Sequence, residues 1–391
     1  MDVRNTERKI QPLIKNIRMK TNVQILFVAV FIFILSLLLG PAMLKAQTAF
    51  YKVKGKVIDK TTRLPLQGAS VFAQNTTIGE ATDSAGNFSI YLPEGGYSLA
   101  TTYTGYETEI IRINHATSLN DSLVIELNPV EQSLEAVTVI INPEVKNGWE
   151  KYGSFFTDNF VGQTKFARQC VIKNPEVLHF YFSKKNDKLK VLAKEPLIVD
   201  NFALGYTLKF AIDSFTNYYT THTNLFIGYP LSEQMQGDSA QQKIWNENRA
   251  SAYKGSLLQF MRSLYSQTLA EDSFQLQFIV KNNGDDYPIP LENLYGALNY
   301  QSDDSTNIVS FRPNQQEVAL IYTDAKPEKN YLDMDSTVNK NFQLSTLIFP
   351  KDEIFYIEQN GFFYDQEDII TNGYLGFKKI GDMLPYDYEP E

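Results

Sequence analysis

Residues 82–99 read TDSAGNFSIYLPEGGYSL, a short alternating run between two turn signals. In the first turn the side chain of Asp83 can accept backbone N–H groups, and Gly86 can adopt a positive φ without steric cost. The alternation that follows places two sets of side chains on opposite faces of a strand: Phe88, Ile90 and Leu92 on one face, and Asn87, Ser89 and Tyr91 on the other. The stretch therefore predicts a half-buried β-strand bounded by tight turns.

Similar short runs surround this strand between residues 51 and 128. YKVKGKVID, ASVFAQ, YSLATTY, ETEIIRI and SLVIEL alternate with turn sequences such as TTRLPLQG and EGG. Short strands at such regular spacing are typical of a β-sandwich. Aromatic residues make up 13% of the chain, and they suit half-buried pleated sheets better than helices. We therefore predict a mainly β fold.

Four groups of residues in this region carry a resemblance to a known family. They are G-x-V-x-D from Gly55 to Asp59, PLQGA at 65–69, T-D-x-x-G-x-F from Thr82 to Phe88, and GY at 105–106. The region resembles the carboxypeptidase-regulatory-like domain, an Ig/prealbumin-like β-sandwich for which we expect seven strands. Modules of this family are non-catalytic and often stand at the N-terminus of outer-membrane nutrient receptors and other envelope proteins. The resemblance covers about 75 of the 391 residues and implies a location and an architecture, without a chemistry.

The first 46 residues have the pattern of a signal peptide. An uncharged, almost wholly apolar run from Ile25 to Gly40 follows basic residues, and we expect cleavage after Ala46. The alternative is an uncleaved anchor, because Ile25 to Leu44 has about the 20 residues that a membrane-spanning helix needs. Gly40-Pro41 favours cleavage, since it breaks a helix where a cleavage region begins. The sequence predicts an exported protein, periplasmic or associated with the outer membrane.

The rest of the chain is acidic. Residues 1–46 hold seven Lys or Arg and two Asp or Glu, which leaves 29 basic and 43 acidic residues and a net charge of −14. Such a surface repels phosphate backbones and anionic lipid headgroups, so nucleic acid is not an expected partner. Cys170 is the single cysteine, which excludes an internal disulfide and the usual lipoprotein anchor. Membrane association is expected through the N-terminal segment or through a partner.

SLEAVTVI at 133–140 is similar to the β-forming box that energised outer-membrane receptors offer to the coupling protein TonB. Only 251 residues follow it, whereas a receptor barrel needs ~22 strands of ~10 residues with their loops. The energised-receptor hypothesis is therefore disfavoured. We predict a last strand here, within a linker that spans residues 129–147.

Residues 148–390 predict a second, α+β domain dominated by antiparallel sheet. YTLKFAIDSF alternates from Tyr206 to Ile212 as a strand with one buried face does. One helical stretch is expected from Ser239 to Leu269, with Gly255 as a point where it divides. Its apolar positions at helical spacing are Ile244, Ala252, Leu258, Met261 and Leu264.

The second region carries a weaker resemblance, through NENRASAYKGSLLQFMRSL and KEPLIVDNFALGY, to exported proteins of unassigned function. A histidine often stands in those proteins where this chain has Gln259, so that position is not an essential ligand or base here. The resemblance implies no activity.

Motifs for metal or covalent chemistry are weak. The histidines, His115, His179 and His222, are far apart, and none has a His or Cys at ligand spacing. DMDSTV at 333–338 matches the D-x-D-x-T pattern of phosphotransferases. The residues before it are polar and do not form the apolar strand that this chemistry needs, which favours a solvated turn. The chain has no G-x-S-x-G, P-loop or G-x-G-x-x-G motif. We predict no metal, no cofactor and a buried thiol at Cys170.

Two groups of residues remain as candidate sites. Asn248, Arg249 and Tyr253 lie within about one and a half turns of the expected helix, where Arg249 and Tyr253 share a face and can receive a carboxylate or a sugar. The alternative is that Arg249 attaches the helix to the sheet. The acidic cluster of Asp365, Glu367 and Asp368 can in principle provide the acid and base of a glycosidase, although such clusters are usually solvated loops.

The sequence thus favours a non-enzymatic exported envelope protein that serves as a binding or structural module for a partner protein or a glycan. The alternative is a periplasmic or surface hydrolase that acts on glycan or peptide through carboxylates of the second domain.

Overall fold

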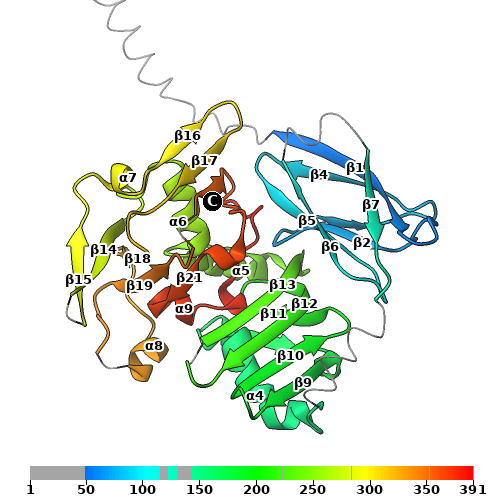
Figure 1. The fold of residues 1–391 in the computed structure, drawn as a ribbon, viewed down its shortest axis with the longest axis horizontal. Helices are drawn as coiled ribbons and strands as arrows, with labels where there is room; N and C mark the ends of the chain where they lie inside the picture. The colour runs from blue at the N-terminus through cyan, green and yellow to red at the C-terminus, as the bar shows by residue number, and fades with distance from the viewer. Residues whose placement is uncertain are drawn as a thin grey trace, which may run out of the picture. The chain divides into compact units, whose positions relative to one another are not determined.

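The computed structural model describes residues 49–114, 122–130, 143–221, 223–282, 284–335, 337–351 and 353–390 (Figure 1). The predicted signal peptide, the 133–140 box, His115 and His222 lie outside these residues. Residues 50–391 group into one compact unit by their contacts. Among the described residues, no helix combines the length and the apolar character needed to cross a bilayer. The fold is mainly β, as predicted.

Seven strands at the N-terminus form two sheets of a sandwich. One sheet has the order β4-β1-β7, in which β1 (Phe50–Asp59) pairs antiparallel with β4 (Asn87–Pro93) and parallel with β7 (Leu123–Leu127). The other sheet has the order β3-β2-β5-β6, from β2 (Ser70–Ala73), β3 (Gly79–Ala81), β5 (Tyr97–Thr102) and β6 (Glu109–Ile113). Their inward side chains, such as Val57, Leu92 and Leu99, form a shared core.

The turn before β4 confirms the first prediction. The Oδ1 atom of Asp83 accepts the backbone N–H groups of Ala85 and Asn87, both at 2.8 Å, and Gly86 has φ +79°. In the strand that follows, the side chains of Phe88, Ile90 and Leu92 are buried, while that of Tyr91 is exposed. Local turn chemistry and alternation were therefore sufficient to predict this turn and the half-buried strand that follows it.

A six-stranded antiparallel sheet follows. Its strands are β8 (Cys170–Ile172), β9 (Leu178–Ser183), β10 (Lys188–Ala193), β11 (Leu197–Asn201), β12 (Tyr206–Tyr218) and β13 (Thr223–Gln234), in the order β8-β11-β12-β10-β9 with β13 on the other side of β12. Tyr206, Leu208, Phe210 and Ile212 of β12 are buried, as the alternation predicts. Helix α4 (Gly148–Phe160) packs Phe156 and Phe160 against this face. The short 3-10 helices η1 (Ala167–Gln169) and η2 (Pro175–Val177) flank β8.

The predicted helical stretch divides into α5 (Ser239–Tyr253) and α6 (Leu257–Tyr265). Gly255, at φ +63°, separates them, and the Oγ atom of Ser256 accepts the backbone N–H of Gln259 to begin α6. The predicted apolar position of Ile244 is wrong, because its side chain is 56% exposed and Trp245 is buried instead. Gly205 and Gly237 lie against the Trp245 ring and leave room for it.

The rest of the chain forms two further sheets around a second core. The five-stranded sheet has the order β15-β14-β18-β19-β21, from β14 (Phe274–Asn282), β15 (Asp285–Pro290), β18 (Glu317–Tyr322), β19 (Gln343–Ile348) and β21 (Ile370–Asn372). The three-stranded sheet is β16 (Gln301–Asp303), β17 (Ile308–Phe311) and β20 (Phe355–Glu358). Short helices connect them: α7 (Leu294–Ala297), α8 (Lys329–Met334), η3 (Gln366–Asp368), α9 (Gly373–Phe377) and η4 (Ile380–Asp382). Phe260 and Leu264 of α6 belong to this core.

The predicted linker is described only at its two ends. Pro129 forms an isolated bridge with Tyr106, and Glu144 forms one with Tyr181. The division into domains at 51–128 and 148–390 remains a prediction.

Candidate functional site

The loop between β2 and β3 joins the sandwich to the edge of the six-stranded sheet. The backbone N–H of Asn75 donates to the carbonyl of Pro230 at 2.7 Å, and the N–H of Ser232 donates to the carbonyl of Thr76 at 2.9 Å. Thr76 thus extends the edge of β13 as a short parallel bridge to Leu231. Asn75 adopts φ 53°, a left-handed conformation that asparagine tolerates better than most residues.

The C-terminal segment, residues 384–389, lies against the same loop. The backbone N–H of Tyr386 donates to the carbonyl of Asn75 at 2.6 Å, and the carboxylate of Asp387 accepts the N–H of Thr77 at 2.9 Å. From the other side, the guanidinium of Arg262 donates to the carbonyls of Tyr386 and Tyr388. The segment is therefore fixed between the sandwich and α6.

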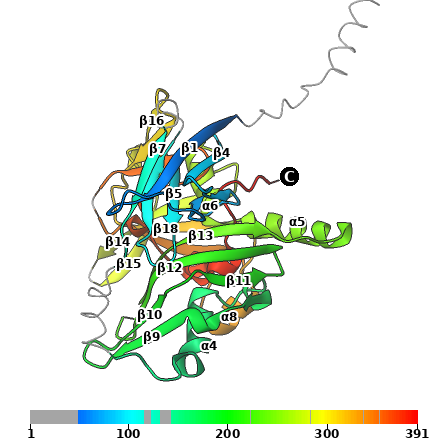
Figure 2. The ribbon, with the colours of Figure 1, turned by 90° about the vertical axis from the view of Figure 1, so that its right-hand side faces the viewer.

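Helix α5 begins beside this segment and is attached to the rest of the protein by a narrow stripe of buried residues. The Oδ1 atom of Asp238 accepts the backbone N–H of Gln241 at 2.9 Å and caps the helix. The buried residues of α5 are Trp245, Arg249 and Ala252. Nε1 of Trp245 donates to the carbonyl of Phe202 at 2.9 Å. Figure 2 shows α5 projecting from the ends of the strands, which leaves its flanks accessible.

The predicted patch on α5 holds the turn between β11 and β12. Nδ2 of Asn248 donates to the carbonyl of Ala203 at 2.8 Å, and Nε of Arg249 donates to that of Leu204 at 2.7 Å. The guanidinium of Arg249 also covers the ring of Tyr206, 4.1 Å from its centre, and the residue is only 7% exposed. These contacts are those of an arginine that attaches the helix to the sheet, the alternative that the sequence left open.

Tyr253 faces a different neighbour. Its ring lies 5.8 Å from that of Tyr388, and the Arg262 guanidinium is 5.7 Å from its ring centre. Arg249 thus contacts Tyr206 of β12, whereas Tyr253 contacts Tyr388 of the C-terminal segment. Their role in binding a ligand stays a prediction.

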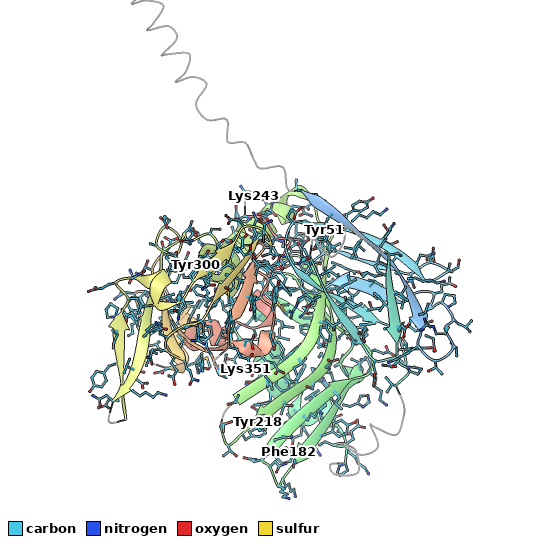
Figure 3. All side chains as sticks on the ribbon, turned by 45° about the horizontal axis from the view of Figure 1, so that its top comes forward. Tyr51, Phe182, Tyr218, Lys243, Tyr300 and Lys351 are labelled. Atoms are coloured by element: carbon cyan, nitrogen blue, oxygen red, sulfur yellow. The ribbon has the colours of Figure 1, made fainter. Side chains whose placement is uncertain are left out.

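An open pocket of about 840 Å³ lies between these elements, and we call it the α5 pocket. It is lined by Thr77, Tyr206, Gln234, Ser239, Gln242, Lys243, Asn246, Glu247, Arg249, Ala250, Pro385, Asp387, Tyr388 and Glu389. Arg249 belongs to both the predicted patch and this lining, whereas Asn248 and Tyr253 do not line it. The exposed side chain of Lys243 marks one wall (Figure 3).

The electrostatics of the α5 pocket are mixed. Lys243 and Glu247 stand one turn apart on α5, with Nζ and Oε1 separated by 4.0 Å. Burial raises the pKa of Tyr206 to about 12, although the Arg249 guanidinium acts in the opposite direction. The phenol of Tyr206 is therefore neutral at ordinary pH. The pocket offers amides, hydroxyls and a few charges of both signs, a set suited to a ligand rich in hydroxyl groups.

The acidic cluster is organised by a lysine. Nζ of Lys351 lies 3.1 Å from the carboxylate of Asp368 and 3.3 Å from that of Asp365, and these two carboxylates raise the pKa of Lys351 (Figure 3 labels Lys351). Asp365 also caps η3 by accepting the backbone N–H of Glu367 at 2.9 Å. None of the three acidic residues lines the α5 pocket. The cluster is arranged as a capped turn with an ion pair, and its catalytic role stays a prediction.

The remaining motifs are placed as follows. Nδ1 of His179 is 2.9 Å from the carboxylate of Glu144. Burial raises the pKa of the half-buried Cys170 thiol to about 12, so the thiolate is disfavoured. Asp335 accepts both the N–H and the hydroxyl of Thr337, which is the solvated turn expected for DMDSTV. Within the described ranges, no three His, Cys, Asp or Glu side chains gather closely enough to hold a metal ion.

The residues that sequence reasoning missed are those that build the walls of the pocket. Thr77 comes from the sandwich and Asp387 and Tyr388 come from the C-terminus, so no local pattern joins them to α5. One signal was available, since two tyrosines between prolines in LPYDYEP are unusual for a solvated tail.

The match to a family model covers the sandwich. Residues 53–139 match the CarboxypepD_reg-like domain family. This segment is a CarboxypepD_reg-like domain. A TonB-dependent receptor P3 from Formosa agariphila is 29% identical over 101 residues, which are 26% of this chain and 10% of the receptor. The chain thus spans about a tenth of the length of that curated relative. A CarboxypepD_reg-like domain thus occurs in this chain and in a TonB-dependent receptor.

Two solved structures show distant likenesses to this chain. A 9R-lipoxygenase from Cyanothece has a TM-score of 0.16 and 8% identity, over 57% of this chain and 49% of that one. The major pilin subunit BcpA of Bacillus cereus has a TM-score of 0.14 and 12% identity, over 82% of this chain and 97% of that one. Likenesses at this level carry no argument about fold or function.

Proposed function

We propose that this chain is a non-enzymatic, exported protein of the cell envelope and that the α5 pocket binds a glycan. Export and an envelope location are supported by the signal-peptide pattern and by the CarboxypepD_reg-like domain, a domain type that the Formosa agariphila receptor also contains. The domain type does not indicate which ligand is bound, so we infer the ligand from the size and lining of the pocket.

The α5 pocket is the single observation that carries the proposal. Its volume of about 840 Å³ is within the ~300–1,000 Å³ of small-ligand sites, and a short oligosaccharide fits such a space. Thr77, Gln234, Ser239, Gln242 and Asn246 offer hydroxyl and amide groups that both donate and accept hydrogen bonds, which matches the hydroxyls of a sugar. A partner protein would instead favour an apolar centre with few charges.

The proposal is tested by filling the pocket. Ala250 is exposed on α5 and lines the pocket, whereas Ala240 is exposed on the same helix and does not line it. We expect one class of a panel of neutral, acidic and amino-sugar oligosaccharides to bind by calorimetry. Ala250→Trp should weaken that binding at least tenfold, and Ala240→Trp should leave it unchanged.

Three outcomes would overturn the proposal. The first is that no oligosaccharide binds, and the second is equal binding by the two tryptophan variants. The third is release of shorter products from a bound glycan, which would favour the hydrolase alternative. Cross-linking in intact cells tests whether the ligand is a protein. Capture of a stoichiometric protein partner that is lost on Ala250→Trp would show that the pocket binds a protein and not a glycan.

A further inference from the structure

The outer face of the sheet β4-β1-β7 carries a row of lysines. Lys52, Lys54 and Lys56 alternate along β1 with buried residues, so they share its outward side. The register of β1 with β4 places Tyr91 opposite Lys52, and the register with β7 places Val124 beside Lys56. We call this surface the basic face, made of Phe50, Lys52, Lys54, Lys56, Tyr91 and Val124.

The lysines at the centre of the basic face have no acidic partner among the described residues. Within the described part of the chain, neither Lys52 nor Lys54 has an ion pair, and Nζ of Lys52 lies 5.4 Å from the centre of the Tyr91 ring. Three acidic side chains on or beside the strands of the sandwich have other partners. Glu126 pairs with Arg63, and Glu80 accepts the backbone N–H of Ser89. Asp83 binds its own turn, where Lys56 adds an attraction that lowers its pKa further.

Apolar side chains frame the lysines. Phe50 is 60% exposed, Tyr91 58% and Val124 57%. Among the described residues, six large apolar side chains are more than 55% exposed, and these are three of the six. Lysines beside exposed aromatic residues are the combination that suits a membrane surface, because the ammonium groups meet phosphates while aromatic rings enter the headgroup layer.

The net charge of the chain does not exclude this partner. The rest of the chain is acidic, but the Debye length of about 8 Å at physiological ionic strength screens charges on the other faces. The acidic average therefore does not prevent a local basic face from meeting an anionic surface.

We propose that the basic face docks on a membrane surface rich in anionic phospholipid headgroups. Lys52, Lys54 and Lys56 bind the phosphates, and the rings of Phe50 and Tyr91 lie among the headgroups. This docking orients the sandwich on the membrane whether or not the N-terminal segment is cleaved, and it is independent of the ligand of the α5 pocket.

The experiment uses a chain that begins at residue 47, because residues 50–391 form one compact unit and the apolar run would bind lipid of any charge. Co-sedimentation is measured with vesicles of phosphatidylcholine alone and with vesicles rich in phosphatidylglycerol. We expect binding to the anionic vesicles only, decreasing as salt is raised. Each lysine at an anionic surface strengthens binding about fivefold, so the triple change Lys52→Gln, Lys54→Gln and Lys56→Gln should weaken it about 100-fold.

A matched control keeps the net charge equal. Lys184, Lys185 and Lys194 are exposed residues beside β9 and β10, and changing all three to Gln should alter binding less than about twofold. The pair Phe50→Ser and Tyr91→Ser should weaken binding while its salt dependence remains. Equal binding to neutral vesicles, equal losses in the two triple variants, or no binding of the unchanged chain at low salt would each overturn the proposal.

Discussion

The backbone N–H of Tyr386 donates to the carbonyl of Asn75 at 2.6 Å, which joins the C-terminal segment to a loop of the sandwich. Nδ2 of Asn75 also donates to the carbonyl of Leu384, 309 residues away, at 3.3 Å. Through these contacts the end of the chain holds the first strands in place. The wall of the α5 pocket thus depends on residues from both ends of the described chain.

Arg262 is the residue on which the C-terminal segment depends most. Its guanidinium donates to the carbonyls of Asn360, Tyr386 and Tyr388, and its side chain is only 12% exposed. Arg262→Ala leaves these carbonyls without their donor, at about 1 kcal/mol or more each, so we expect the free energy of unfolding in urea to fall by about 3 kcal/mol. The exposed Arg168→Ala is the control and should cost less than about 0.5 kcal/mol. A loss equal to that of the control would show that the segment needs no such attachment.

Two glycines with the same φ angle allow the cost of backbone strain to be separated from the cost of a steric clash. Gly68 and Gly86 both have φ +79°, but a Cβ atom on Gly86 would lie 2.6 Å from the carbonyl oxygen of Val57, while one on Gly68 would meet nothing within 4 Å. Gly68→Ala should therefore cost only the left-handed strain of about 1 kcal/mol. Gly86→Ala should cost at least about 2 kcal/mol more, because β1 has to move away from the turn. Thermal and urea unfolding measure the stability of both variants. Equal losses of stability would mean that the turn moves away from β1 without a measurable cost.

Some of this architecture could be predicted from sequence because its causes are local. Turn chemistry at Asp83 and Gly86 predicted the turn before β4, and Gly255 predicted the division between α5 and α6. The buried stripe of α5 was predicted less well, because helical spacing favoured Ile244 as a buried position. Trp245, one position later, is buried because Gly205 and Gly237 provide the space for its ring, and those glycines are remote from α5 in the sequence.

The candidate site was harder to predict for the same reason. The position of Arg249 on a helix could be derived from periodicity, but the walls of the pocket could not. Thr77 and Asp387 meet through long-range hydrogen bonds that leave no pattern in either segment. Sequence periodicity describes one element at a time, so it does not predict a pocket that is built from three distant segments.

The edge strand β15 is protected from pairing by its prolines. All six of its residues are exposed, and Pro288 and Pro290 pair in register with Ile279 and Gln277 of β14. The two prolines are two residues apart, so the N–H groups that they lack fall on the same side of β15. Proline within a ladder is confined to the open side of an edge strand, which here is the side away from β14. The double change Pro288→Val and Pro290→Val restores these donors, so we expect concentration-dependent association in sedimentation velocity.

The control for this edge is Ile289→Val, which keeps a β-branched residue and adds no donor. It should stay in the same oligomeric state as the unchanged chain at every concentration. If the double proline variant also does so, the outward edge of β15 is protected by something other than its missing donors.

Glu358 makes stability depend on pH. The residue is 4% exposed and accepts a hydrogen bond from the hydroxyl of Tyr364 at 3.1 Å. Burial raises its pKa from the ordinary 4.5 to about 7, with a smaller rise from Glu94 and opposing effects from Tyr364 and Arg112. The folded state therefore holds a proton that the unfolded state releases. This contribution to stability is fully present below about pH 4.5 and is lost as the pH rises to about 7, by about 3 kcal/mol.

Glu358→Gln removes the charge and can still accept the hydrogen bond of Tyr364. We expect the variant to be about as stable as the unchanged chain at pH 5 and more stable by about 2–3 kcal/mol at pH 8, from urea unfolding at both pH values. The exposed Glu367→Gln should give no such difference. Asp382 has a pKa that burial raises to about 6 and acts in the same direction, so the comparison has to be made between variants and not across pH in one chain. If the advantage of Glu358→Gln is the same at pH 5 and pH 8, the buried carboxyl is not the group that titrates.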